Sequence, residues 1–138
     1  MQHKILHVED NPDDVMLVNM AFTKAEASVS LEVATDGDKA IAALQNGSEP
    51  LPVCVLLDIK LPSISGFEVL SWIRSQSRFK HLPVIMLTSS LLPKDINRAY
   101  DLGANSYLVK PAELDSLIAL ARTIDLYWLR TNIRPTAG

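Results

Sequence analysis

The chain has 138 residues, of which 48% are hydrophobic and 21% charged, a composition typical of one globular domain. The net charge is −3 and no stretch concentrates lysine and arginine, which argues against a nucleic-acid partner, because phosphate-backbone binding needs a basic patch. No apolar run approaches the length of a membrane span, the N-terminus has no signal-peptide pattern, and a lone cysteine excludes an intrachain disulfide. We therefore expect a cytoplasmic protein with a single domain over residues 1–138.

Short apolar runs alternate along the chain with longer segments of helical period. The apolar runs predict strands at 4–8, 30–34, 53–58, 84–88 and 106–110. Between them, capping residues and apolar spacing predict helices at about 11–22, 38–47, 67–75 and 93–102. A last helix of roughly twenty residues is expected from Pro111 onward, with an extension at about 125–138.

The order of these elements predicts the fold class. Five strand-then-helix units in succession indicate a doubly wound α/β domain, with parallel strands, right-handed crossovers and helices on both faces. The third and fourth strands are apolar at nearly every position, as strands covered on both faces should be.

Charged and hydroxyl side chains follow the predicted strands. The first strand ends in Glu9 and Asp10, the third in Asp58, the fourth in Thr88 and the fifth in Lys110. In doubly wound sheets, ligands bind beyond the carboxyl ends of the strands, so we expect these five side chains to converge.

The expected charges at this edge indicate a chemistry. Three carboxylates and one ammonium leave about −2 in a small cleft, which favours an added cation. A hard divalent cation with oxygen ligands, Mg²⁺ above all, needs no histidine or cysteine. With a metal and Lys110 beside it, the Asp58 carboxylate can attack phosphorus, because both cations neutralise the incoming phosphoryl group.

These motifs, in this order and spacing, resemble the receiver domain of two-component response regulators over nearly the whole chain. The matching pieces are Glu9-Asp10 before Asn11-Pro12, Asp58 before Leu61-Pro62 and Gly66, Thr88-Ser89, and Lys110-Pro111. The resemblance implies a flavodoxin-like sheet of order 2-1-3-4-5. It also implies a protein that accepts a phosphoryl group from a histidine kinase and catalyses only its own phosphorylation and dephosphorylation.

The resemblance assigns a role to each site residue. Asp58 would be the phosphoacceptor, Thr88 the switch hydroxyl, Tyr107 the switch aromatic and Lys110 the partner of the phosphoryl group. Mg²⁺ would be held by Asp10 directly, by Glu9 largely through water, by Asp58, and by the backbone carbonyl of Lys60.

One position departs from the family pattern. Lys60 places a cationic side chain two residues after Asp58, where relatives often carry a neutral or small residue. Because this side chain is expected near the path of attacking water, we expect it to affect the lifetime of the phosphoryl group.

The C-terminal segment has a second apolar face beyond the stripe that packs on the sheet. This face, the predicted partner surface, comprises Leu126, Tyr127, Trp128, Leu129 and Ile133. Such a face on a terminal helix usually needs a partner. The tail resembles those of single-domain response regulators that partner bacterial and cyanobacterial phytochromes, which implies a homodimer and a phytochrome kinase as phosphodonor.

The same sheet edge could in principle serve other functions. A flavodoxin-like cofactor carrier needs a phosphate-cradling loop after the first strand, where this chain has the acidic EDNPDD. A phosphatase of the haloacid dehalogenase type normally has a second acid where this chain has Lys60. The complete set of acids, Thr88 and Lys110 argues against a degenerate receiver used only as a binding module, although Lys60 leaves room for unusual kinetics. Among single residues, Asp13 and Asp14 are interpreted only as acids at a helix N-terminus, and Tyr107 could be simple packing.

Overall fold

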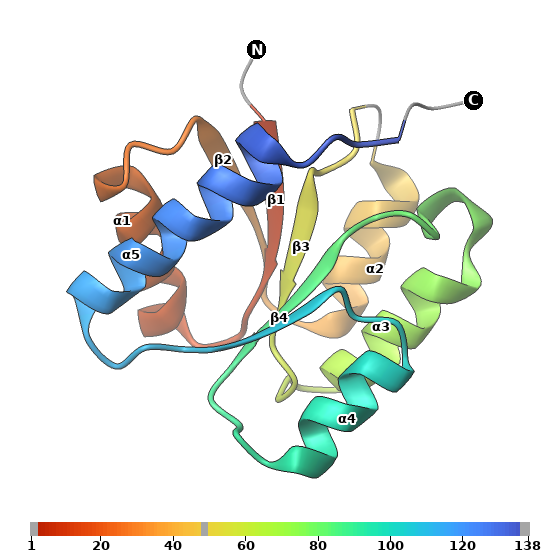
Figure 1. Ribbon diagram of the computed structural model, residues 1–138. Coiled ribbons are helices and arrows are strands. Elements are labelled where there is room, and N and C mark those ends of the chain that lie inside the picture. The colour runs from red at the N-terminus through yellow and green to blue at the C-terminus, as the bar shows by residue number, and fades with distance from the viewer. Residues whose placement is uncertain (1–2, 48–49, 136–138) are drawn as a thin grey trace.

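The computed structural model describes residues 3–47 and 50–135, which form one parallel five-stranded sheet of order β2-β1-β3-β4-β5 (Figure 1). Its strands are β1 (His3–Val8), β2 (Val29–Ala34), β3 (Cys54–Leu57), β4 (Val84–Thr88) and β5 (Ser106–Val109). The helices are α1 (Pro12–Lys24), α2 (Gly37–Asn46), α3 (Gly66–Ser75), α4 (Pro93–Asp101), α5 (Leu114–Ile124), the short 3₁₀ helix η1 (Ser77–Phe79) and the π-helix η2 (Asp125–Thr131). The predicted fold class and strand order are confirmed.

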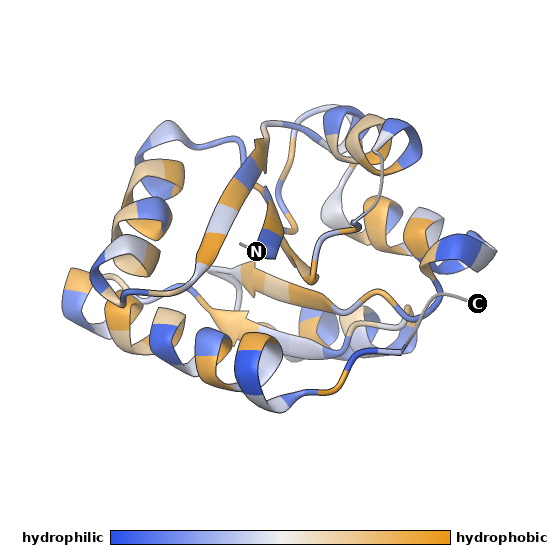
Figure 2. Ribbon diagram, turned by 90° about the horizontal axis from the view of Figure 1, so that it is seen from above, coloured by the Kyte–Doolittle hydropathy of each residue, from blue (hydrophilic) through white to orange (hydrophobic). Residues whose placement is uncertain are grey.

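Helices cover both faces of the sheet. Helices α1 and α5 lie together on one face, and α2, α3 and α4 on the other (Figure 1). Each face has its own cluster of buried apolar side chains. Strands β3 and β4 are buried at every position, which explains their continuous apolar sequence. In Figure 2 the central strands are mostly orange, the colour of hydrophobic residues, whereas the helices mix orange and blue. No helix in the described residues is long and apolar enough to cross a membrane.

Helix α1 begins directly after the acidic end of β1. Asn11 caps it, because its side-chain oxygen accepts hydrogen bonds from the backbone N–H groups of Asp13 (2.9 Å) and Asp14 (3.4 Å). Pro12 occupies the first helical position, where its missing N–H costs nothing. This local sequence fixes where Asp13 and Asp14 stand relative to the sheet edge.

The strand register brings the predicted site residues to one edge. Val8 pairs with Leu57, and the N–H of Asp58 donates to the Val8 carbonyl at 3.2 Å. Two strands further along the sheet, the N–H of Lys110 donates to the carbonyl of Thr88 at 2.8 Å. The loops after β1, β3 and β4 therefore gather at the lower edge of the view in Figure 1.

The last helix differs from its prediction at both ends. Helix α5 begins at Leu114 rather than at Pro111, and at Asp125 it widens into the π-helix η2. Trp128 and Leu129, both assigned to the predicted partner surface, pack against the buried apolar cluster beside α1 and α5.

We predict that Gly66→Ala destabilises the fold by about 2–3 kcal/mol, as overpacking of a tight contact does. A Cβ at Gly66 would lie 2.0 Å from the backbone oxygen of Asp58, which cannot move without displacing the end of β3. Urea unfolding followed by circular dichroism measures the loss. The control is Ser116→Ala, at an exposed position of α5, and a loss no larger than that of the control would contradict the prediction.

Candidate functional site

Three carboxylates meet at the carboxyl edge of the sheet. Glu9, Asp10 and Asp58 each offer an oxygen, and these oxygens lie within 4.8 Å of one another. Glu9 and Asp58 are buried, whereas Asp10 is exposed. Three carboxylate oxygens reachable from solvent through Asp10 fit a hard divalent cation, and a partly buried cluster of like charges favours binding one.

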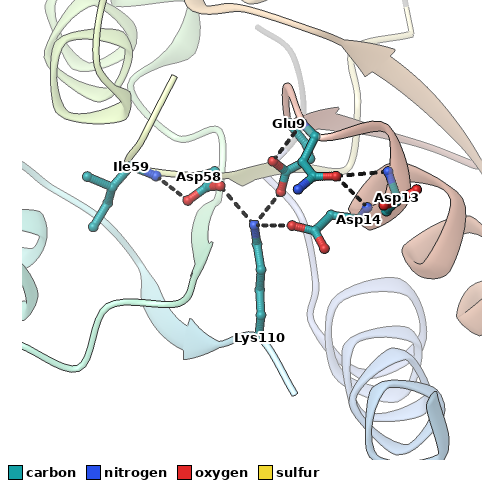
Figure 3. Close-up of polar contacts among 7 residues, drawn as sticks. Glu9, Asp13, Asp14, Asp58, Ile59 and Lys110 are labelled. Carbon is teal, nitrogen blue, oxygen red and sulfur yellow. Dashed lines mark hydrogen bonds and ion pairs between the residues drawn. The ribbon is translucent and has the colours of Figure 1, made fainter. Parts of the chain in front are cut away.

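Lys110 lies at the centre of the site, where its ammonium faces three acids (Figure 3). The Nζ atom is 2.5 Å from Glu9 Oε1, 2.8 Å from Asp58 Oδ2 and 3.0 Å from Asp14 Oδ2. Burial alone would lower the pKa of Lys110, but hydrogen bonds to Asp58, Glu9 and Asp14 outweigh it and raise that pKa above its usual value. Lys110 is therefore a permanent cation at physiological pH.

Asp58 is held through both of its oxygens. Oδ1 accepts a hydrogen bond of 2.7 Å from the backbone N–H of Ile59, and Oδ2 accepts one from Lys110. These contacts fix the orientation of the carboxylate and satisfy it in a place where an unpaired charge would be costly.

Glu9 is the most buried of the acids. Burial raises its pKa above the usual value, while its hydrogen bonds to Lys110 and to the backbone N–H of Asn11 act in the opposite direction. Without Lys110, the negative charge of this buried carboxylate would have no ion-pair partner among the described residues.

Asp14 is a site residue that the sequence analysis missed. Its interpretation as a simple helix-terminus acid is wrong, because its Oδ2 contacts Lys110 on the α1 side of the site (Figure 3). The two residues are 96 positions apart in the chain. The only sequence signal is its place, in the first turn of the helix that begins after Glu9-Asp10.

The predicted switch residues lie beside the site on β4 and β5. Thr88 is buried at the end of β4. The Tyr107 hydroxyl donates a 2.9 Å hydrogen bond to the Ser90 carbonyl, and burial raises the pKa of Tyr107. The Ser90 hydroxyl donates to Asp95 at 2.6 Å, so Tyr107 is connected to the first turn of α4.

Lys60 lies on the loop after β3, with an exposed side chain. Together with Asp10 it lines an open surface hollow that Phe67 and Arg98 also line, and the Arg98 guanidinium lies 4.3 Å from the Phe67 ring centre. A cationic residue therefore lines the same hollow as Asp10, one of the three acids of the candidate metal cluster.

Comparison with known proteins gives the class to which this fold and site belong. Residues 5–122 match the response regulator receiver domain family. The chain is 40% identical over 134 residues to the probable methanogenesis regulatory protein FilR2 of Methanothrix harundinacea, covering 95% of this chain and 86% of FilR2. The chain thus belongs to the response regulator receiver domain family.

Two solved structures narrow the relationship. The phosphorylated cyanobacterial phytochrome response regulator RcpA matches with a TM-score of 0.89 and 34% identity, covering 99% of this chain and 100% of RcpA. The Mn²⁺-bound form of response regulator Rcp1, a protein of Synechocystis, matches with a TM-score of 0.85 and 35% identity, covering 97% of this chain and 99% of that structure. This chain is a response regulator receiver related to the phytochrome response regulators.

We predict that a divalent cation, Mg²⁺ or Mn²⁺, raises the melting temperature of the protein, because a ligand that binds only the folded state stabilises it. Asp10→Asn should remove most of this rise, since it deletes the exposed carboxylate of the cluster. Differential scanning fluorimetry across a cation titration measures it, with the exposed Asp101→Asn on α4 as the control. An unchanged cation response in Asp10→Asn would show that the cation binds elsewhere.

Proposed function

We propose that the chain acts as a single receiver domain over residues 1–138, which accepts a phosphoryl group on Asp58 in a Mg²⁺-dependent reaction. The observation that carries the proposal is the oriented Asp58 carboxylate, beside a permanent ammonium and two further acids that can hold a metal. This combination supplies a nucleophile together with the positive charge that a phosphoryl group requires.

The proposed reaction is a displacement at phosphorus. An oxygen of Asp58 forms a bond to phosphorus as the bond from phosphorus to the donor's leaving group breaks, and the leaving group departs with the electron pair. Mg²⁺, held by Glu9, Asp10, Asp58 and the Lys60 carbonyl, would supply charge neutralisation for the phosphoryl oxygens. Lys110 exchanges Asp58 for a phosphoryl oxygen, and the Thr88 hydroxyl donates to another.

The phosphorylated state acts through a change in protein contacts. When Thr88 bonds to the phosphoryl group, Tyr107 and its Ser90 partner respond, because they lie on the adjacent strand and on the loop after β4. Leu91 and Leu92, which follow Ser90 directly in the chain, are exposed apolar residues that such a change would affect. Output through protein contacts also fits the acidic net charge of the chain, which does not favour DNA.

We place the protein in the cytoplasm, and the phosphodonor we infer for it is a sensor histidine kinase, specifically a phytochrome kinase. Support comes from the relatives RcpA and Rcp1, of which RcpA is described as a phytochrome response regulator, and whose lengths are nearly that of this chain. A kinase must bring its phosphoryl group to a part of the site that solvent reaches. Asp10 and Lys60 are exposed at this edge of the sheet, so a kinase could approach the site there.

We expect a homodimer through the predicted partner surface. The side chains of Leu126, Tyr127 and Ile133 are 62%, 50% and 92% exposed. Such a concentration of solvent-exposed apolar side chains in one short segment is unfavourable in a monomer and is typical of an interaction surface. Trp128 and Leu129 are half-buried against the core and would support the surface from beneath, with the Trp128 ring edge-on to Tyr127 at 4.9 Å.

Phosphoryl transfer is tested by incubating the protein with a small-molecule phosphodonor and Mg²⁺ and measuring the intact mass. We expect a gain of one phosphoryl group that is stable in acid and labile in base. Asp58→Asn and a metal-free sample should show no gain, whereas Asp101→Asn should behave as the unmodified protein. No gain in a folded protein that binds Mg²⁺, also after incubation with a phytochrome kinase, would leave a receiver that serves only as a binding module.

The dimer is tested by light scattering coupled to size-exclusion chromatography. Leu126→Arg combined with Ile133→Arg should give a monomer, because the charges cannot be buried without partners. The matched control is Leu91→Arg, which changes an apolar side chain that is 69% exposed at the opposite edge of the sheet and should leave the dimer intact. A monomeric unmodified protein, or a dimeric double variant, would refute the proposed interface.

A further inference from the structure

The Lys110 ammonium lies within ion-pair distance of three carboxylates, and it donates hydrogen bonds to two of them, Asp14 and Asp58. Two of these acids, Glu9 and Asp58, belong to the candidate metal cluster, and the third, Asp14, does not. We propose that Asp14 is a positioning residue that retains Lys110 in the site when a divalent cation takes over Glu9 and Asp58. This inference rests on the proposed function, because it concerns how the same site accommodates its metal.

The need for such a residue follows from competition between two cations. Lys110 and a divalent cation would share the same two carboxylates, and like charges on shared oxygens repel each other strongly in a partly buried site. Glu9 is 1% exposed and Asp58 9% exposed at their side chains, so water screens the repulsion poorly. Either the cation binds weakly, or the ammonium needs another anionic partner.

Asp14 has the properties of that partner. Its carboxylate already contacts Lys110 at 3.0 Å, from the α1 side and opposite Asp58 (Figure 3). Its side chain is 34% exposed, so it can stay charged with little desolvation cost. The N-terminus of α1 adds the favourable end of the helix dipole, and the Asn11 cap fixes the backbone of Asp14.

The consequence is that cation binding does not expel the lysine. With Asp14 present, the Lys110 ammonium gives up its ion pairs with Glu9 and Asp58 and keeps the one with Asp14. It therefore stays within reach of an arriving phosphoryl group. Without Asp14, no other acid of the described residues outside the metal cluster pairs with the ammonium, so Lys110 continues to compete for Glu9 and Asp58. Removing the Asp14 charge therefore weakens metal binding through Lys110.

Asp13 provides a matched control in the same helical turn. It carries the same charge and is exposed, and its backbone N–H bonds to the same Asn11 oxygen as that of Asp14. Within residues 3–47 and 50–135, the acids found within ion-pair distance of Lys110 are Glu9, Asp14 and Asp58, and Asp13 is not among them. Asp13→Asn thus reports the general effect of lost negative charge near the site.

The experiment is isothermal titration of Mg²⁺ into the unmodified protein, Asp13→Asn, Asp14→Asn, Asp14→Glu, Lys110→Met, and Lys110→Met combined with each Asn substitution. Asp14→Asn should weaken Mg²⁺ binding about fivefold more than Asp13→Asn, the scale of one partly exposed ion pair. Asp14→Glu should retain most of the affinity. In the Lys110→Met background the excess effect of Asp14→Asn should vanish, because the residue acts through the lysine.

Three results would overturn the role of Asp14. Equal effects of Asp13→Asn and Asp14→Asn would show a general charge effect, and an excess that persists in Lys110→Met would show that Asp14 acts on the metal directly. Failure of Asp14→Glu to retain affinity, with folding verified by circular dichroism, would exclude a carboxylate partner. If the unmodified protein binds no Mg²⁺, the proposed function itself fails, which is distinguishable from all three.

Discussion

The ion pairs of Lys110 are the interaction on which the rest of the site depends. Two carboxylates buried at the end of a sheet are unstable alone, because desolvation and mutual repulsion both oppose their charge. The Lys110 ammonium between Glu9 and Asp58 stabilises their buried negative charges. It reaches them because β5, which Lys110 follows, is separated from β3 only by β4 in the sheet. The parallel sheet is therefore more than a scaffold, since its register sets the electrostatic balance of the site.

This arrangement also connects the site to distant surfaces. The backbone N–H of Lys110, which follows β5, donates a hydrogen bond to the Thr88 carbonyl. Tyr107 lies on β5, and its hydroxyl donates a hydrogen bond to the carbonyl of Ser90 on the loop after β4. Helix α5 follows β5 and continues into η2, which carries the exposed apolar side chains Leu126 and Tyr127. Lys110, which contacts Asp58, follows β5 directly, so β5 lies between the site, the loop after β4 and the helix that leads to the proposed dimer surface.

Local sequence was a good guide wherever the signal was local. The apolar run of β4 and the capped start of α1 were predicted with accurate bounds, because strand periodicity and an Asn-Pro cap are encoded within a few residues. The end of α5 was less predictable. At Asp125 the α-helix widens into a π-helix, and Trp128 and Leu129 pack against the cluster beside α1 and the sheet. The spacing of the apolar residues in the sequence does not predict this packing.

The sequence by itself determined the order of strands and helices, and it identified Glu9, Asp10, Asp58, Thr88 and Lys110 as strand-end residues of one edge. It could do so because alternating strand and helix units have few possible topologies, and all of them place the carboxyl ends of the strands together. Only the tertiary structure decided which acids share the lysine. Asp14 joins Lys110 through the packing of α1 against the sheet edge, a contact across 96 positions of the chain that no local pattern encodes.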